Sequence, residues 1–285
     1  MPALTLERLQ EYRQQTFRWS QFTRLRSQEE AVEFVNQRGF VSFWTIKGAL
    51  LPSLWAAVAG DRPVPNNHDD PAHITWTWKD GLLDKRRWYY GRLLRRRNTI
   101  ISLPVMPYFY ALSPNFGDYQ NDYLQQYYDG ELPLESRQIY EALLEKGPLD
   151  TLELRRVAHL TDPSSSRFNR ALDNLQVEMK ILPVGISPVG AWKYAFIYDI
   201  VPRYFPNLIE QCRFITEGQA RQEILALYFQ SVGAASLNQI QYLFSWKEEN
   251  ALQALRRHVE SGLLAADVEI PGQPGPGYAL PNLLE

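Results

Sequence analysis

Apolar residues recur at helical spacing in three successive segments in the middle of the chain, and strand-like segments follow them. Residues 136–147 have the spacing of one helix face and end at a glycine, a common helix stop. Residues 148–158 predict a short second helix, and residues 168–179 predict a third. Residues 181–186 and 192–199 are rich in β-branched and aromatic residues and are separated by a turn with proline and glycine. We therefore expect three helices and a β-hairpin.

The end of the chain has the same order of elements. Residues 220–233 predict a helix that ends at a glycine, residues 236–244 a short helix with a serine cap, and residues 249–262 a third helix. Two strands, at 263–270 and 278–280, flank a turn rich in proline and glycine. Three helices followed by a hairpin wing form the winged-helix plan, a variant of the helix-turn-helix. The sequence thus predicts an internal repeat of this plan.

A third, divergent copy is expected in the first half. Residues 27–39 begin with a serine, have glutamate three positions later and end at a glycine, which is the pattern of a capped helix. We expect residues 88–97 to continue as a helix and residues 100–112 to form the β-hairpin of this copy. The expected fold is α+β but mainly α. It has three tandem winged-helix modules, the first with a basic and aromatic insert, at residues 1–132, 133–208 and 209–285.

The composition of the 285 residues, 45% hydrophobic and 22% charged, is typical of a soluble globular protein. A net charge of −2 argues against a protein that coats nucleic acid, so any phosphate contact must come from a local patch. Cys212 is the single cysteine, which excludes an intrachain disulfide and a cysteine-based zinc or iron–sulfur site. We find no signal-peptide pattern and no membrane-length apolar run. We expect a cytoplasmic protein without membrane association, metal or cofactor.

Residues 76–97 contain most of the candidate chemistry. This basic run has eight Lys or Arg residues, two Asp residues and five aromatic residues, in a chain that is slightly acidic overall. Guanidinium groups bind phosphates through paired hydrogen bonds, and flat rings stack on bases. The alternative is a solvated amphipathic helix whose rings face the core. The candidate nucleic-acid-binding residues are Trp76, Trp78, Lys79, Lys85, Arg86, Arg87, Arg92, Arg95, Arg96 and Arg97.

Four segments of the chain resemble a known family. They are residues 51–62, the basic run, residues 181–186 and the terminal unit at 233–280. Most of residues 20–281 is similar to the tandem winged-helix proteins related to bacterial crosslink-repair DNA glycosylases, the AlkZ/YcaQ-like group. The resemblance implies three winged-helix modules around a concave surface that faces DNA.

The chain departs from this family at the catalytic motif. The resemblance implies a glutamine–apolar–glutamine or glutamine–x–aspartate motif directly after a glycine, which corresponds here to Gly39. Val41 and Phe43 stand where the polar residues should be, and neither side chain can hydrogen-bond or position a water. A Gln–Ile–Gln sequence at residues 239–241 has the right letters, but it lies in the short helix of the last unit and is weak evidence. We therefore expect a divergent branch of the family.

The loop from His68 to His73 is a second polar cluster. Two imidazoles and two carboxylates could bind a divalent metal or position a water, and Asp69 or Asp70 could assist the cleavage of a glycosidic bond. Short Asp–Asp–Pro loops are also common turns and helix caps. We favour the turn or cap, and keep Asp69 and Asp70 as the candidate catalytic carboxylates.

Taken together, the sequence favours a DNA-binding protein related to DNA repair, which grips duplex or damaged DNA through the basic run. One alternative is a DNA glycosylase that excises alkylated or crosslinked bases. Another is a non-catalytic scaffold for protein interactions, in which acidic partners neutralise the basic run. DNA binding differs from the scaffold in one structural requirement: the arginines must be exposed and largely free of carboxylates.

Overall fold

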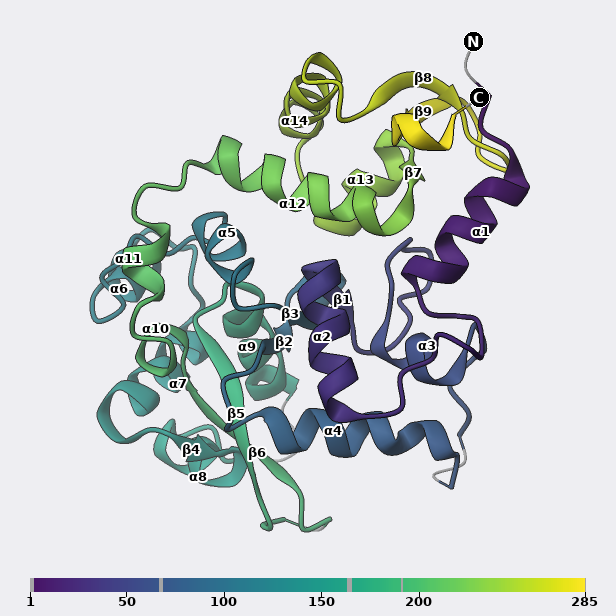
Figure 1. The fold of residues 1–285 in the computed structure, drawn as a ribbon. Coiled ribbons are helices and arrows are strands. Elements are labelled where there is room, and N and C mark those ends of the chain that lie inside the picture. Colours follow the sequence, from purple (N-terminus) through teal and green to yellow (C-terminus); the bar gives the residue numbers. More distant parts are fainter. Residues whose placement is uncertain (1–2, 67–68, 163–165, 191, 285) are drawn as a thin grey trace.

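The computed structural model describes residues 3–66, 69–162, 166–190 and 192–284. Helices surround three small antiparallel sheets of three strands each, and both ends of the chain lie at the same corner of the molecule (Figure 1). More of the chain is helical than extended, as expected for a mainly helical α+β chain. Among the described helices, none has both the length and the apolar character needed to cross a lipid bilayer.

The first unit begins at α2, and its antiparallel strands have the order β1–β3–β2. Ser27 caps α2 by accepting a hydrogen bond from the Glu30 N–H, as the capping pattern predicts, and Gly39 ends the helix with a φ of 80°. The elements are α2 (Gln28–Arg38), β1 (Phe40–Ser42), α3 (Leu54–Ala59), the 3-10 helix Pro71–His73, α4 (Ile74–Leu82), β2 (Tyr89–Arg92), the 3-10 helix Leu94–Arg96 and β3 (Asn98–Ile101).

The second and third units have the same order of elements: a helix, a strand, two helices and a β-hairpin. Their strand orders are β4–β6–β5 and β7–β9–β8, so the last strand of each unit lies in the centre of its sheet. The second unit consists of α7 (Leu134–Lys146), β4 (Leu149–Asp150), α8 (Thr151–Val157), α9 (Ser166–Val177), β5 (Ile181–Ser187) and β6 (Ala195–Ile200). The third consists of α12 (Glu217–Val232), β7 (Ala234–Ala235), α13 (Leu237–Phe244), α14 (Glu248–Glu260), β8 (Ala265–Glu269) and β9 (Pro276–Ala279).

Short helices connect the units, and the first helix of the chain packs on the third unit. The connectors are α5 (Met106–Ala111), α6 (Asp122–Tyr128), α10 (Val201–Tyr204) and α11 (Leu208–Cys212), and a 3-10 helix, Pro281–Leu283, lies near the end. Within α1 (Leu6–Thr16), the Arg13 guanidinium donates hydrogen bonds to the carbonyls of Val232 and Ala234, each at 2.9 Å. These bonds hold α1 against the third unit, and near the end of the chain the Arg8 guanidinium donates to the Asn282 carbonyl at 2.8 Å. The two ends of the chain lie close together (Figure 1).

Both faces of the first sheet are buried. Successive residues of a strand point to opposite faces, so each strand contributes to two rows of side chains. One row of paired residues faces a core that extends through all three units: Phe40, Tyr89 and Ile101. The other row faces the core of the first unit: Val41, Tyr90 and Ile100. The sheet therefore joins two cores, and its position is fixed from both sides.

This two-sided burial explains where the sequence prediction was wrong. Residues 88–97, expected to be helical, form β2 and the turn after it. Residues 100–112, expected to be a hairpin, form the end of β3 and then α5. A strand with both faces buried has a continuous apolar run instead of alternation, and periodicity alone does not distinguish such a run from a buried helix. The hairpin is present, but it lies about ten residues earlier than expected.

Ile100 offers a test of the central position of this sheet. Replacing Ile100, which is fully buried, with alanine should lower the free energy of unfolding by about 2–5 kcal/mol, because a cavity opens where the two cores meet. The matched control is Ile74→Ala, whose side chain is 43% exposed and should change stability by less than about 0.5 kcal/mol. Equal urea midpoints for the two variants would contradict this arrangement.

Candidate anion-binding site at the first hairpin

The basic run is divided between buried and exposed surfaces. Trp78 and Lys79 are buried at 7% and 1% exposure, whereas Trp76 is 41% exposed. The remaining cations of the run are all exposed: Lys85, Arg86, Arg87, Arg92, Arg95, Arg96 and Arg97. The rings of Trp88, Tyr89 and Tyr90 face the cores. The arrangement thus combines inward rings with outward cations, but on a hairpin instead of a helix.

Three exposed arginines of the hairpin line one pocket. Arg92 ends β2, and Arg96 and Arg97 follow in the turn before β3. The pocket has a volume of about 250 Å³, and its lining residues are Trp44, Thr45, Ile46, Arg92, Arg96, Arg97 and Asn98. None of these seven residues carries a carboxylate, so this arginine pocket is a concentrated positive site in a chain of net charge −2.

Helix α9 of the second unit holds two of these arginines in place. Arg92 Nη1 donates to both carboxylate oxygens of Asp173, at 2.8 and 2.9 Å, and Arg96 Nη1 donates to the Asn174 Oδ1 at 2.7 Å. Within the described part of the chain, Arg97 makes no ion pair and no side-chain hydrogen bond. Asp173 therefore offsets the charge of Arg92, while Arg96 and Arg97 form no ion pair with a carboxylate among the described residues.

The turn that carries the arginines has a strained backbone. Arg95 and Arg96 have φ angles of 53° and 55°, in the left-handed region that costs an L-residue about 1–2 kcal/mol. The Thr99 hydroxyl stabilises the turn by accepting a hydrogen bond from the Leu94 N–H at 3.1 Å. Strained residues persist only where the surrounding structure fixes them, and they are frequent at ligand sites.

An aromatic cluster borders the arginine pocket. Trp44 lines the pocket and also contacts the rings of Trp55 and Trp76, with centroids at 5.3 and 6.0 Å. Because Trp76 is partly exposed, the pocket combines guanidinium groups with accessible ring surface. Neither Trp44 nor the pocket residues Thr45 and Asn98 were candidates from sequence. The only sequence signal for these residues was their nearness to segments already of interest: Trp44 directly follows the position that matches the family's motif, and Asn98 follows the basic run.

The other cations of the basic run lie elsewhere. Arg95 stacks over the Tyr242 ring of the third unit, at 4.2 Å from its centroid. Lys85 pairs with its neighbour Asp84, at 3.1 Å between the Lys85 Nζ and the carboxylate. No ion pair or side-chain hydrogen bond of Arg87 is found among the residues described. The structure therefore brings together three of the expected contact residues and disperses the others.

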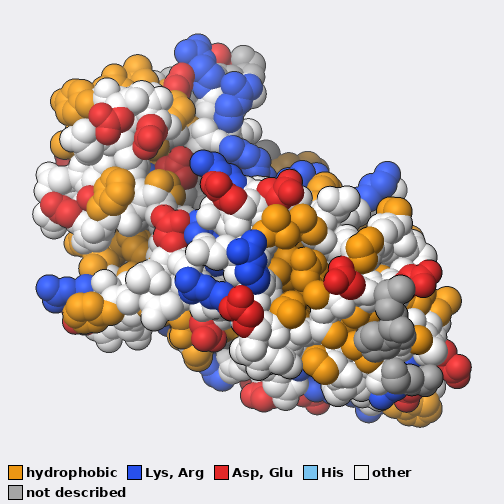
Figure 2. All heavy atoms as spheres, turned by 90° about the horizontal axis from the view of Figure 1, so that it is seen from above, with side chains coloured by type: hydrophobic (Ala, Val, Ile, Leu, Met, Phe, Trp, Pro, Cys, Tyr) orange, Lys and Arg blue, Asp and Glu red, His pale blue; other side chains and the backbone are white. Residues whose placement is uncertain are grey.

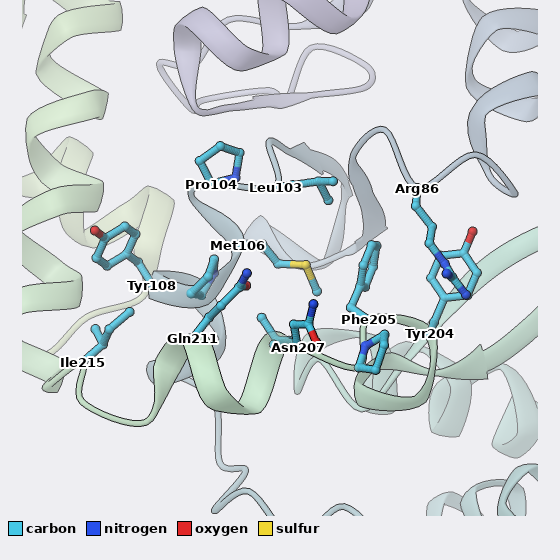
Figure 3. A pocket seen from close by; sticks show the side chains of 13 residues that line it. Arg86, Leu103, Pro104, Met106, Tyr108, Tyr204, Phe205, Asn207, Gln211 and Ile215 are labelled. Atoms are coloured by element: carbon cyan, nitrogen blue, oxygen red, sulfur yellow. The ribbon is translucent and has the colours of Figure 1, made fainter.

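Arg86 belongs to a separate and larger pocket. Its guanidinium lies over the Tyr204 ring, 4.7 Å from the centroid. Figure 3 shows the pocket of about 650 Å³ beside it, in which Met106, Phe205 and Ile215 provide apolar surface and Arg86 stands at one end. This pocket and the arginine pocket have no lining residue in common.

Lys79 lies in an aromatic cage between the first two units. Its Nζ is within 6 Å of five ring centroids, those of Phe43, Trp76, Tyr90, Tyr194 and Phe196. The Nζ also forms an ion pair with Asp80 and donates to the Tyr194 hydroxyl at 3.0 Å. Burial lowers the pKa of Lys79, and Asp80 partly opposes this effect. Lys79 joins the units and has almost no surface to offer to a phosphate.

The position that matches the family's catalytic motif is part of the core. Val41 and Phe43 are buried, and the Phe43 ring meets those of Trp44 and Tyr90 edge-on, at 4.6 and 6.1 Å. Gln239, in the decoy Gln–Ile–Gln sequence, has a capping role, because its side-chain oxygen accepts a hydrogen bond from the Ser236 N–H at 2.9 Å. Val41 and Phe43 thus offer no polar side chain, and Gln239 is committed to the cap of α13.

The acidic loop forms a helix cap. Asp70 accepts hydrogen bonds from Arg62 at 2.7 Å and from the Ala72 N–H at 2.9 Å, and these contacts lower the pKa of its carboxyl group. Asp69 is exposed, and His68 lies outside the described residues. The described ranges hold no group of three His, Cys, Asp or Glu side chains that could bind a metal ion. Asp70 is thus committed to the cap, as the sequence pattern of this loop favours.

The chain mixes both charge signs with apolar patches on its surface, as one face of the molecule shows (Figure 2). The fold and the arginine pocket together define a protein of three repeated helix-and-hairpin units with a positive site on the first hairpin. Comparison with known families places it more closely: the chain belongs to the AlkZ-related family, whose model matches residues 25–245. The resemblance inferred from sequence is therefore confirmed.

A solved structure has a similar fold. The DNA glycosylase AlkZ of Streptomyces sahachiroi superposes with a TM-score of 0.51, over 94% of this chain and 70% of the other, at 11% sequence identity. No curated protein matches the chain in sequence. At this identity the likeness is one of fold, so the chemistry must be argued from the residues of this chain.

The pKa of Lys79 leads to a prediction about stability and pH. Between the lowered pKa of the folded state and the ordinary pKa of the unfolded state, the unfolded chain binds more protons, so stability rises with pH. The free energy of unfolding of the natural chain should therefore rise relative to that of Lys79→Met as the pH is raised from 7 to about 10. Urea titrations at several pH values measure this difference.

The control for this experiment is Lys85→Met, which removes an exposed lysine from the same run. Its stability should follow that of the natural chain at every pH. If the curves for Lys79→Met and the natural chain stay parallel, the amine is not desolvated in the folded protein.

Proposed function

We propose that this chain is a DNA-binding protein related to DNA repair, and that the arginine pocket holds the phosphate backbone of duplex or damaged DNA. The observation that carries the proposal is the convergence of Arg92, Arg96 and Arg97 on a pocket whose lining has no carboxylate. Guanidinium groups suit phosphates because their donors match two oxygens at once. Membership of the AlkZ-related family and the fold shared with a DNA glycosylase support it.

The repeated units support the same proposal. We infer that each is a winged-helix module, because each has the order helix, strand, two helices and hairpin, with the last strand in the centre of the sheet. Winged helices are variants of a fold that places a helix or a hairpin against DNA. In the first module the arginines lie on the hairpin, so the wing, and not the third helix, would make the contact. Trp44 and Trp76 would meet sugars or an exposed base next to the phosphates.

Binding is favoured over base excision. Where the family resemblance implies glutamines, this chain has Val41 and Phe43 inside the core, and Asp70 is held by Arg62 as a cap. A buried valine and phenylalanine cannot orient a water toward a glycosidic bond. The scaffold alternative requires acidic partners for the basic run, and among the described residues Asp173 is the one carboxylate that forms an ion pair with an arginine of the pocket.

The salt dependence of binding tests the arginine pocket. Each neutralised phosphate contributes about −0.9 to the slope of log affinity against log salt concentration. Replacing Arg92, Arg96 and Arg97 with alanine should therefore flatten the slope by about 2, because Asp173 already offsets the charge of Arg92. The single variant Arg97→Ala should flatten it by about 1, and it should fold normally because Arg97 has no partner to lose among the described residues. Fluorescence anisotropy with a labelled duplex gives both slopes.

The matched control is the triple variant of Lys85, Arg86 and Arg87, which removes the same charge from the same run but leaves the arginine pocket intact. The salt slope of this control should lie closer to that of the natural chain than the slope of the arginine-pocket variant does. A slope that is unchanged in the pocket variants, or that flattens equally in the control, would refute the proposed site.

Catalysis is tested on the same preparations. We expect that duplexes containing N7-alkylated bases will accumulate no abasic sites above the level seen without protein, because the described site has no group to activate water. Abasic sites are detected by strand cleavage with alkali. Excision by the natural chain would favour the glycosylase alternative and would require a catalytic group other than the motif position and the Asp70 carboxylate.

A further inference from the structure

A second pocket shares Arg96 with the arginine pocket and draws on all three units. It has a volume of about 570 Å³, within the range of sites for small molecules and cofactors. Its chemically important lining residues are Arg95, Arg96, Glu178, Arg221, Phe244 and Trp246. They come from the turn of the first hairpin, the residue after α9, the N-terminal part of α12, and the end of α13 with the turn that follows it. No comparison or motif assigns a role to this pocket.

The lining has a positive surplus and one poorly compensated carboxylate. Three guanidinium groups and one acid, Glu178, line the pocket, and one of the three, Arg221, is already ion-paired with Glu217. The Glu178 Oε2 is buried and has no donor within hydrogen-bond distance among the described residues. The nearest cation is Lys180, 3.7 Å away between Nζ and Oε2, and that amine donates instead to the Asn115 Oδ1 at 2.6 Å. Burial raises the pKa of Glu178. A buried acceptor without a donor is costly, and a ligand with an N–H group would relieve it.

The third unit provides a flat surface. The rings of Phe244 and Trp246 stack with centroids 4.5 Å apart and planes inclined by 18°, and both rings are half-buried. Stacked rings with a free edge or face are the usual platform for a nucleobase. A guanidinium group lies close to these rings. Ser245 stands between Phe244 and Trp246 in the sequence, and the Arg95 Nη1 donates to its hydroxyl at 3.4 Å.

Strained backbone is concentrated around this pocket. Arg95, Arg96 and Ser245 line it with φ angles of 53°, 55° and 57°, and Met179, next to Glu178, has a φ of 52°. These are four of the nine non-glycine residues with positive φ among those described. Such residues persist where surrounding contacts fix them, and they gather at ligand sites. The concentration at one pocket is an observation independent of its charges.

We propose that this pocket binds a single nucleotide, with guanine as the preferred base. The base would stack on Trp246, and the phosphate would lie between the guanidinium groups of Arg95 and Arg96. The Glu178 carboxylate would accept hydrogen bonds from the base. Guanine fits best, because its N1–H and its amino group both donate along one edge, whereas adenine presents an acceptor beside its amino group. The proposal goes beyond DNA backbone binding, since a free mononucleotide could fill the pocket.

The nucleotide could come from either of two sources, and the experiment separates them. Isothermal titration of the full chain with dGMP and with dAMP tests a free nucleotide. Competition between duplexes that carry one unpaired guanine or one unpaired adenine tests a nucleotide within a strand. A preference for guanine of about tenfold in either assay supports the proposal, and the assay that shows it identifies the source.

Glu178→Gln should abolish the preference for guanine, and Trp246→Ala should weaken the binding of both nucleotides. The matched control is Glu131→Gln, because Glu131 acts on Glu178 through its charge but does not line the pocket. This control should keep the preference. Equal binding of both bases, a preference that survives in Glu178→Gln, or the absence of nucleotide binding in both assays would overturn the proposal.

This test is independent of the proposed backbone binding. Glu178→Gln should bind a fully paired duplex with a salt slope no flatter than that of the natural chain, because Glu178 does not line the arginine pocket and the substitution removes a negative charge near Arg96. If paired duplex binding fails in the natural chain while dGMP still binds selectively, the backbone proposal falls and the nucleotide pocket stands.

Discussion

Burial of the first sheet on both faces is the constraint on which the rest of the structure depends. The rows on either side of β3 anchor the hairpin in two cores at once, and one of those cores is common to all three units. A hairpin fixed in this way can carry a turn that would be unstable alone. The left-handed Arg95 and Arg96 are therefore held in place by apolar packing several residues away. The charges of the site are exposed, but their positions are set by the cores.

The same burial accounts for the chemistry that this chain lacks at the family's motif position. Val41 alternates with Phe40 on a strand that has no solvent face, so a polar side chain there would need a buried partner. The polar group beside the second motif position, Phe43, is Lys79, and its amine already has Asp80, Tyr194 and the surrounding rings as partners. The aromatic cage closes the region where the resemblance implies catalytic glutamines, while Trp44, at its edge, turns toward the arginine pocket.

Sequence reasoning succeeded where the physical signal is local. The helices of the second and third units follow from spacing, caps and glycine stops, and the expected helix at 136–147 corresponds to α7 at Leu134–Lys146. The hairpin of the first unit was misplaced, since Tyr89, Tyr90 and Gly91 are all buried and show no alternation. The arginines of the pocket all belong to the basic run, but spacing does not tell which arginines converge. That depends on Asp173 and Asn174, which are about eighty residues distant in sequence.

Contact between the units gives the site a property that no single unit has. Arg92 and Arg96 belong to the first hairpin but are oriented by α9 of the second unit, and Arg95 stacks on Tyr242 of the third. The turn between β2 and β3 is thus a junction of all three units, with the arginine pocket and the nucleotide-sized pocket both formed from it. Any shift of one unit relative to another would change both pockets together, because Arg96 lines each of them. Long-range order among the units is therefore a condition for the geometry of both pockets, and the shared core maintains that order.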